Sequence, residues 1–312
     1  MSRRVLFYVL IVVVLWGSHS PVATLVMTAH GGTPLSQHGL LFFELLFAGG
    51  CLFVIILCTG RLGEFRKYTW GDVRSLVFAG VFGYFLNYFF LLGALALARP
   101  ENAVTEAIIL DHLFPMCTLL ASAAILRERL TVRGLVSAAV GFAGACVVVC
   151  QGDFTRIALR HPLVDLMAVA AAASWGIFSA LGRRRPYEPL TSLFVFILTG
   201  LVIAGCILPF TGGRHVPVGW EFYGAFHIGF LSNTLGVMLW LLALKEGGAS
   251  VVGNLALLAA FVNLVLIRLL LPDQTISPWA MAGLAVILLG VLLSRVPARR
   301  QPDPSRPPSP PA

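Results

Sequence analysis

Long apolar runs recur along almost the whole of this chain, and they restrict its fold more than any other feature. Each run holds about twenty mostly apolar residues, which as a helix would cross a hydrocarbon core of about 30 Å. The 312 residues are 58% hydrophobic and 12% charged, whereas soluble domains are about 45–50% apolar and about 25% charged. The sequence therefore predicts an all-α integral membrane protein and excludes a soluble globular fold. The runs are continuous rather than alternating, so a porin-like barrel is excluded as well.

Ten transmembrane helices are predicted from these runs, each bounded by charge, glycine or proline. They lie at 5–29, 36–60, 72–98, 102–126, 132–150, 162–182, 190–211, 219–244, 249–271 and 277–295. The connections between them are short, so the sequence leaves no room for an extramembrane domain of useful size.

The Lys and Arg residues alternate between the two sides of this predicted topology. Seventeen of the 22 fall on one side, namely Arg3, Arg4, Arg61, Arg66, Lys67, Arg74, Arg127, Arg129, Arg133, Arg183, Arg184, Arg185, Lys245, Arg295, Arg299, Arg300 and Arg306. The other five are Arg99, Arg156, Arg160, Arg214 and Arg268. By the positive-inside rule the richer side is cytoplasmic, so we expect a multi-pass protein of the cell (inner) membrane with both termini in the cytoplasm. This pattern explains the net charge of +8, and no nucleic-acid partner is expected.

The two ends of the chain need separate interpretation. Arg3 and Arg4 before an apolar run could mark a cleaved signal peptide. However, the run from Val5 to about Met27 is longer than a signal h-region, and cleavage would leave nine spans, so we expect it to remain as the first helix. Residues 297–312, rich in Pro, Arg and Ser, predict a disordered cytoplasmic tail.

All six cysteines fall inside predicted spans, where they suit helix packing. They form no loop disulfide framework and no CxxC metal site, and no metal or other cofactor is expected.

The sequence repeats itself at about half its length. The matched pairs are Trp16-Gly17 with Trp175-Gly176, Gly83 and Asn87 with Gly229 and Asn233, and Ala94-Leu95 with Ala243-Leu244. Since each half holds five spans, an odd number, the two halves must enter the membrane in opposite directions. The sequence thus predicts two inverted five-helix repeats, at 1–155 and 156–296, an arrangement typical of secondary transporters.

Several short motifs stand in an order that supports this interpretation. They are Trp16-Gly17-Ser18, Pro115 followed by Arg127-Glu128-Arg129-Leu130-Thr131, Ala173-Ser174-Trp175-Gly176, and Ala243 to Ser250. Together they resemble the drug/metabolite transporter superfamily with its tandem EamA-like halves, over nearly the whole chain. The segment Ile109 to Pro115 resembles the amino-acid exporter branch, in particular the aromatic-amino-acid exporters.

The sequence also departs from that family. Glu44 stands where members often carry an arginine, and Ala259-Ala260 replaces a Glu-Pro usually expected in the ninth span. Pro272-Asp273 lies where the family tends to place an acidic turn residue. Substrate or coupling rules that depend on those positions cannot be transferred.

Ionisable residues inside spans are costly, so they are candidate functional groups. Asp111, Glu106 and Glu44 are the candidates for proton coupling. Pro115 cannot donate to the carbonyl of Asp111, so the helix should kink there. Each acid has an ordinary alternative: an interhelical hydrogen bond of Asp111 to His112 or Asn87, a hydrated helix end for Glu106, and an Arg or His partner for Glu44. For His227 a core hydrogen bond is favoured over a titratable role.

Aromatic and amide side chains in the spans complete the candidate substrate site. The predicted set is Trp16, His19, Tyr84, Asn87, Tyr88, Asp111, His112, Trp175, Asn233 and Asn254. Tyr84 and Tyr88, four residues apart, are expected on one helix face. The alternatives are that the aromatic rings pack against lipid or neighbouring helices, and that the asparagines join helices by hydrogen bonds. Ser137, Gly141 and Ala145 predict a small-residue packing seam in the fifth span.

The resemblance implies a secondary transporter with a central cavity between helices one, three, four, six, eight and nine, working by alternating access. It favours export of small metabolites, in particular amino acids with aromatic or apolar side chains. A transporter of drugs, nucleosides or cations with the same fold is the alternative. An intramembrane enzyme is disfavoured because Asp111 and His112 adjoin and so point to different helix faces, and a channel is disfavoured because no filter motif occurs. The expected partners are a small-molecule substrate and membrane lipid, and a monomer is compatible with the sequence.

Overall fold

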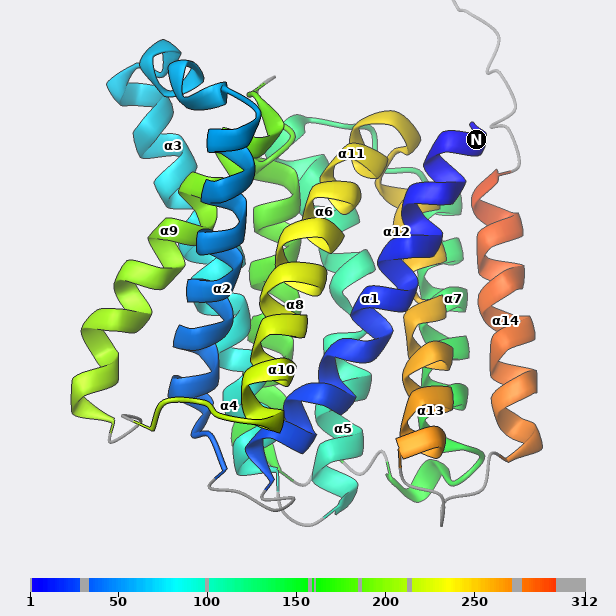
Figure 1. Cartoon of the computed structure of the whole chain (residues 1–312). Coiled ribbons are helices and arrows are strands. Elements are labelled where there is room, and N and C mark those ends of the chain that lie inside the picture. The colour runs from blue at the N-terminus through cyan, green and yellow to red at the C-terminus, as the bar shows by residue number, and fades with distance from the viewer. Residues whose placement is uncertain are drawn as a thin grey trace, which may run out of the picture.

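The computed structural model describes residues 2–28, 34–98, 101–156, 159, 161–184, 187–211, 215–270 and 277–295. The predicted tail at 297–312, Pro272-Asp273 and the loop residues Arg99, Arg160, Arg185 and Arg214 lie outside these ranges, as does the side chain of Arg268. In the described ranges all regular secondary structure is helical (Figure 1), which agrees with the predicted all-α class.

The helices follow the predicted runs closely. The α-helices are α1 (Arg3–Met27), α2 (Gln37–Cys58), α3 (Trp70–Gly80), α4 (Asn87–Leu97), α5 (Glu101–Asp111), α6 (Phe114–Leu126), α7 (Val132–Cys150), α8 (Pro162–Leu181), α9 (Pro189–Ile207), α10 (Trp220–Phe226), α11 (Val237–Gly247), α12 (Ala249–Ala256), α13 (Leu258–Leu270) and α14 (Pro278–Arg295). Short 3-10 helices form η1 (Arg61–Lys67), η3 (Phe154–Arg156) and η4 (Leu208–Phe210), and π-helices form η2 (Val81–Leu86) and η5 (His227–Gly236).

Nine helical segments of the described chain are long and apolar enough to cross a membrane. They are Arg3–Met27, Gln37–Cys58, Trp70–Leu97, Glu106–Leu126, Val132–Cys150, Pro162–Leu181, Pro189–Phe210, Trp220–Gly247 and Ala249–Leu266. The tenth predicted run forms α14, whose apolar stretch Pro278–Ser294 is shorter than the other nine.

We call each membrane-length helical segment a crossing. Four crossings are interrupted: the third and eighth by a π-helix, and the fourth and ninth by a break between two helices. A π-helix joins α3 to α4, and another joins α10 to α11. Gly83 and Gly229, predicted to correspond, lie in these two π-helices. The fourth crossing breaks between α5 and α6, and the ninth breaks at Leu257 between α12 and α13. π-Helical turns occur often at functional sites. We therefore look for a functional site at the depth in the bundle where these interruptions lie.

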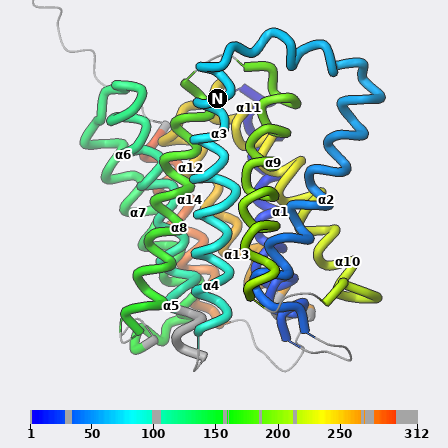
Figure 2. Tube along the Cα trace, turned by 90° about the vertical axis from the view of Figure 1, so that its left-hand side faces the viewer, coloured from blue at the N-terminus to red at the C-terminus, as the bar shows by residue number. Residues whose placement is uncertain are grey.

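Glycines allow close helix packing at both edges of the bundle; at the α3–α9 contact, a Cβ on Gly80 would lie 2.9 Å from the carbonyl oxygen of Phe196. In Figure 1, α7 and α14 lie at one edge and α3 and α9 at the other, and Figure 2 looks from the α3 and α9 side. At the α7–α14 contact glycines lie directly against backbone: a Cβ on Gly283 would lie 2.7 Å from the carbonyl oxygen of Gly144, and one on Gly290 would lie 2.8 Å from the nitrogen of Gly141. In the predicted seam, the backbones of Ser137 and Gly141 contact Gly290 of α14, while a Cβ on Gly141 would collide with Asn254 and Leu257. The small residues thus allow close packing on two sides, as helix association in membranes requires.

The first and last described residues of the chain lie at the same face of the helix bundle. Figure 1 shows the start of α1 and the end of α14 at this face. Two ion pairs connect loops here: Arg61 of η1 pairs with Glu188 before α9, and Arg183 after α8 pairs with Glu128 after α6. Burial alone would raise the pKa of Glu188, but hydrogen bonds from the Thr191 amide and hydroxyl and from Arg61 lower it. Glu188 is thus an ionised N-cap, which suits the positive end of the α9 dipole.

The glycine contact between α7 and α14 generates a stability prediction. Gly283→Leu should lower the thermal unfolding midpoint in detergent, because the new side chain would force apart backbones that now touch, at a cost of about 1–3 kcal/mol or more. Gly50→Leu in α2 is the matched control, since a Cβ there meets nothing within 4 Å. Equal midpoints for the two variants would contradict the packing described here.

Candidate functional site

A cavity of about 80 Å³ lies where five of the crossings approach one another. A single water needs about 10–15 Å³ of such space, so the cavity can hold several waters or the polar end of a small metabolite. Its lining residues come from α1, α4, the α5–α6 break, α8 and α13: Trp16, His19, Ser20, Asn87, Tyr88, Leu91, Asp111, His112, Phe114, Trp175, Ala259 and Asn263.

Pro115 places the acidic corner of this cavity. Because it has no amide hydrogen to donate to the Asp111 carbonyl, α5 ends at Asp111 and α6 begins at Phe114, which confirms the predicted break. The His112 amide bonds to the carbonyls of Ile108 and Ile109, and its ring Nδ1 lies 2.7 Å from the Ile108 oxygen. The break thus brings an acid and an imidazole to the cavity wall.

Aromatic rings form most of the remaining wall. The indoles of Trp16 and Trp175 meet edge to face with ring centres 5.2 Å apart, and Phe114 packs on Trp16 at 5.9 Å. On the α4 side, Tyr88 stacks with His19 at 5.7 Å and meets Trp175 edge to face at 6.4 Å. Such rings offer apolar faces that also attract cations.

Behind this wall lies Trp240 of α11, which is fully buried. Its ring centre is 5.0 Å from that of Trp16, and its indole nitrogen donates to the Ser179 hydroxyl at 3.0 Å. The eighth crossing therefore supports the cavity through Trp240 without lining it.

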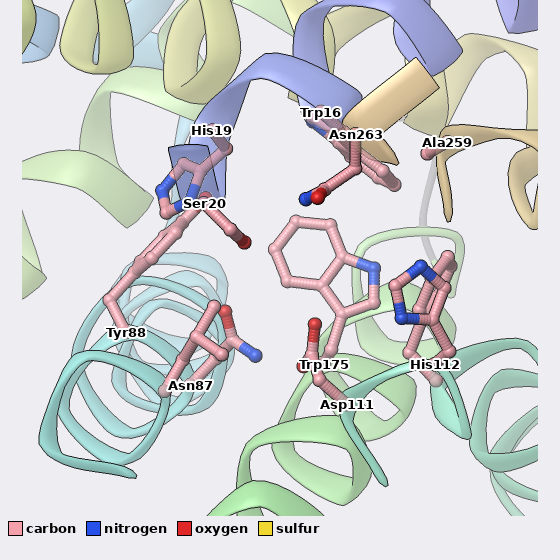
Figure 3. Close-up of a pocket in the computed structure, with 12 residues that line it drawn as sticks. Trp16, His19, Ser20, Asn87, Tyr88, Asp111, His112, Trp175, Ala259 and Asn263 are labelled. Atoms are coloured by element: carbon pink, nitrogen blue, oxygen red, sulfur yellow. The ribbon is translucent and has the colours of Figure 1, made fainter. Parts of the chain in front are cut away.

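Polar groups face the cavity from several helices. Figure 3 shows the polar ends of Ser20, Asn87 and Asn263 turned toward a common space beside the Trp175 indole, with Asp111 next to it. Asn87 is held in place because its amide nitrogen donates to the Ala171 carbonyl at 2.9 Å.

Two buried nitrogen atoms at the cavity are unpaired. Among the residues that the structure describes, neither His19 Nε2 nor Trp175 Nε1 has a hydrogen-bond partner. Buried polar groups are nearly always paired, so these two atoms are candidates for contact with a bound molecule.

Seven of the ten residues predicted to bind substrate line this cavity: Trp16, His19, Asn87, Tyr88, Asp111, His112 and Trp175. The other three lie outside it. The Tyr84 hydroxyl donates to the Asn233 carbonyl at 2.6 Å, in the fully buried contact between η2 and η5. The Asn254 amide lies between α12 and α7, where it donates to the Ser250 carbonyl at 2.8 Å and the Ser137 hydroxyl at 3.3 Å.

The three candidate coupling acids occupy different environments. Asp111 is at the cavity. Glu106 is buried in the middle of α5, where its carboxylate lies 2.9 Å from Nδ1 of His161. Glu44 is fully buried in α2 beside Asn233 rather than beside an Arg or His. His227 bonds to the Ser18 hydroxyl at 2.8 Å, the hydrogen bond expected for it.

Four lining residues were missed by the sequence reasoning: Ser20, Leu91, Phe114 and Ala259. Asn263, an amide side chain within a span like Asn254, is the polar group of the ninth crossing that does line the cavity. Leu91, Phe114 and Ala259 are apolar residues in apolar runs, so the sequence gives no signal that separates them from core residues.

Comparison with known proteins agrees with this architecture. The sequence matches the EamA-like transporter family over residues 3–150 and again over 162–296. It is 26% identical to YyaM of Bacillus subtilis, an uncharacterized transporter, over 257 residues that cover 79% of this chain and 80% of the relative. It is 28% identical to the aromatic amino acid exporter YddG of Ancylobacter novellus over 190 residues, 60% of this chain and 63% of the relative.

A solved crystal structure shares the fold, with a TM-score of 0.76 at 23% sequence identity, covering 95% of this chain and 99% of the other. The two tandem matches together span most of the sequence and coincide with the two sets of membrane-length helices. The chain belongs to the EamA-like transporter family.

Proposed function

We propose that this protein is a secondary transporter that exports small metabolites, in particular amino acids with aromatic or apolar side chains, by alternating access. The observation that carries the proposal is the composition of one cavity: a carboxylate, aromatic faces and unpaired buried nitrogens converge on the same space. The likeness to an aromatic amino acid exporter supports the choice of substrate.

Each part of such an amino acid has a partner at the cavity. The ammonium group would lie by Asp111 and the faces of Tyr88 and Trp175, which attract a cation. The carboxylate would accept hydrogen bonds from His19, Asn263 or the Trp175 indole. The side chain would pack on Trp16 and Phe114. A whole aromatic amino acid needs more space than the cavity has, so helices must part to admit it, as alternating access requires.

The proposed topology has ten spans in two inverted repeats, at 1–155 and 156–296, in the inner membrane with both termini cytoplasmic. Both described ends lie at one face, and the ion pairs at that face join loops predicted to be cytoplasmic. Fusing a reporter enzyme that works only in the cytoplasm after Arg295 should give an active reporter. A reporter that is active only when placed after Cys58 or Leu126, and silent after Arg295, would contradict a cytoplasmic C-terminus.

The cavity lies between five crossings of the same chain rather than at its surface, and on this ground we propose that a monomer suffices for transport. The central test is movement of labelled amino acids, nucleosides and organic cations across proteoliposomes that contain the protein. Saturable movement of aromatic amino acids supports the proposal. Saturable movement of organic cations or nucleosides alone would favour the alternative substrate classes, and silence for every amino acid would contradict the proposed substrate.

Tyr88 generates a first prediction for the cavity. Tyr88→Ala should raise the KM for an aromatic amino acid about tenfold, because losing one aromatic face that contacts an ammonium group or ring costs about 1–2 kcal/mol. Tyr223→Ala is the matched control, since Tyr223 is 66% exposed on α10. Saturation kinetics in proteoliposomes with equal protein content compare the two, and an unchanged KM in Tyr88→Ala would remove Tyr88 from the binding site.

Asp111 generates a second prediction. If its carboxylate takes up and releases the coupling proton, Asp111→Asn should flatten the dependence of transport on pH while the protein still inserts and folds. Glu106→Gln is the control, because Glu106 is paired with His161 away from the cavity. Transport rates measured across a pH series in both variants decide the matter: an unchanged profile in Asp111→Asn would mean that Asp111 only binds substrate or holds structure.

A further inference from the structure

Glu44 lies in the interior of the protein, outside the cavity. Its side chain is fully buried where α2 packs on the π-helix η5. The packing is close, because a Cβ on Gly229 of η5 would collide with the Glu44 backbone carbonyl. Water therefore has no direct approach to this carboxyl in the conformation described here.

Glu44 also lacks the partners that an ionised carboxylate needs. The Asn233 side chain is its polar neighbour. Among the described residues, neither oxygen of Glu44 and neither polar atom of the Asn233 side chain has a hydrogen bond of good geometry. A buried charge without an ion-pair partner is strongly unfavourable, whereas a neutral carboxylic acid is not.

The titratable side chain of η5, the helix packed on α2, is His227, whose ring bonds to the Ser18 hydroxyl at 2.8 Å. From α4, the titratable side chain that interacts with Glu44 is Tyr88, and the same phenol interacts with Asp111. Tyr88 is thus within electrostatic range of both the buried acid and the acid at the cavity.

In the predicted inverted repeat, α9 of the second half corresponds to α2. Comparison of the two helices shows that packing alone does not require an acid at the position of Glu44. Ser36 caps α2 and Glu188 caps α9. Glu44 follows its cap by eight residues, and the residue in the same place on α9 is Phe196, which is also buried. Likewise the Asn87 amide is satisfied by the Ala171 carbonyl, whereas the corresponding Asn233 amide is not. The second-half helix α9 thus has the ring of Phe196 at this position, whereas the first-half helix α2 has the acid Glu44, next to the unpaired amide of Asn233.

From these observations we propose that Glu44 and Asn233 form a proton-binding site separate from the substrate cavity. In the packing described here Glu44 is the neutral acid, whose hydroxyl can donate to the Asn233 side-chain oxygen while the amide nitrogen donates back. Loss of the proton to water requires α2 and η5 to separate. Protonation of Glu44 therefore favours the closed α2–η5 contact. A role of this equilibrium in driving transport rests on the function proposed above. The protonation of Glu44 itself does not depend on that function.

Infrared spectroscopy of the full chain tests the protonated state directly. In nanodiscs at pH 7.5, exposed carboxyls are ionised, and a buried acid gives a separate carbonyl band. We expect this band in the wild type, in Asp111→Asn and in Glu106→Gln, but not in the isosteric Glu44→Gln. Asn233→Val should move the band to higher frequency, because the acid loses its hydrogen-bond partner. A wild type without the band, or a Glu44→Gln protein that keeps it, would overturn the proposal.

A transport measurement separates this site from the proposed substrate. In proteoliposomes, Glu44→Gln should retain exchange of substrate across the membrane and lose accumulation driven by a pH gradient. Full pH-driven accumulation in Glu44→Gln would overturn the coupling role of Glu44. If the wild type moves no amino acid, the proposed function fails, whereas the infrared band still reports whether Glu44 carries a proton.

Discussion

Inside a membrane every backbone group that leaves the helical hydrogen-bond pattern must find a partner within the protein, and this constraint organises the centre of the structure. The π-helix η5 illustrates it. The Ser232 carbonyl accepts from the Trp16 indole at 3.3 Å, and the Asn233 carbonyl accepts from the Tyr84 hydroxyl at 2.6 Å. The Ser232 hydroxyl in turn donates to the Leu15 carbonyl at 2.9 Å. One irregular segment thereby ties α1 and η2 to the eighth crossing and fixes the back of the cavity.

Irregular and regular helices have different tasks in this bundle. The uninterrupted helices α7 and α14 meet through glycines whose backbones touch, so there is no room for them to adjust separately. The interrupted crossings supply Tyr88, Asp111 and Asn263 to the cavity, where they face Trp16 of α1 and Trp175 of α8. Breaks in transporter helices free backbone groups and redirect side chains at the level where a substrate binds.

The three acids in or near the spans differ in the groups that surround each carboxyl, and these groups determine what each acid can do. Glu106 lies beside the His161 ring, Asp111 faces a cavity, and Glu44 is enclosed beside an uncharged amide. An acid in a span is costly wherever it lies, so the sequence marks all three equally. Only the partners, which come from other helices, distinguish a local ion pair from a substrate group and from a buried acid.

The sequence by itself determined the helices, their apolar character, the repeat and the break at Pro115, because span length, hydropathy and the missing proline amide are local properties. It also selected most residues of the cavity, because polar and aromatic side chains within spans are rare. Tertiary structure alone decided between Tyr84 and Tyr88. Four residues apart, they share a helix face as expected, and their ring centres lie 6.0 Å apart. Tyr84 nevertheless bonds to the Asn233 carbonyl, while Tyr88 lines the cavity, because the partner of each phenol comes from other helices that only the tertiary structure brings near.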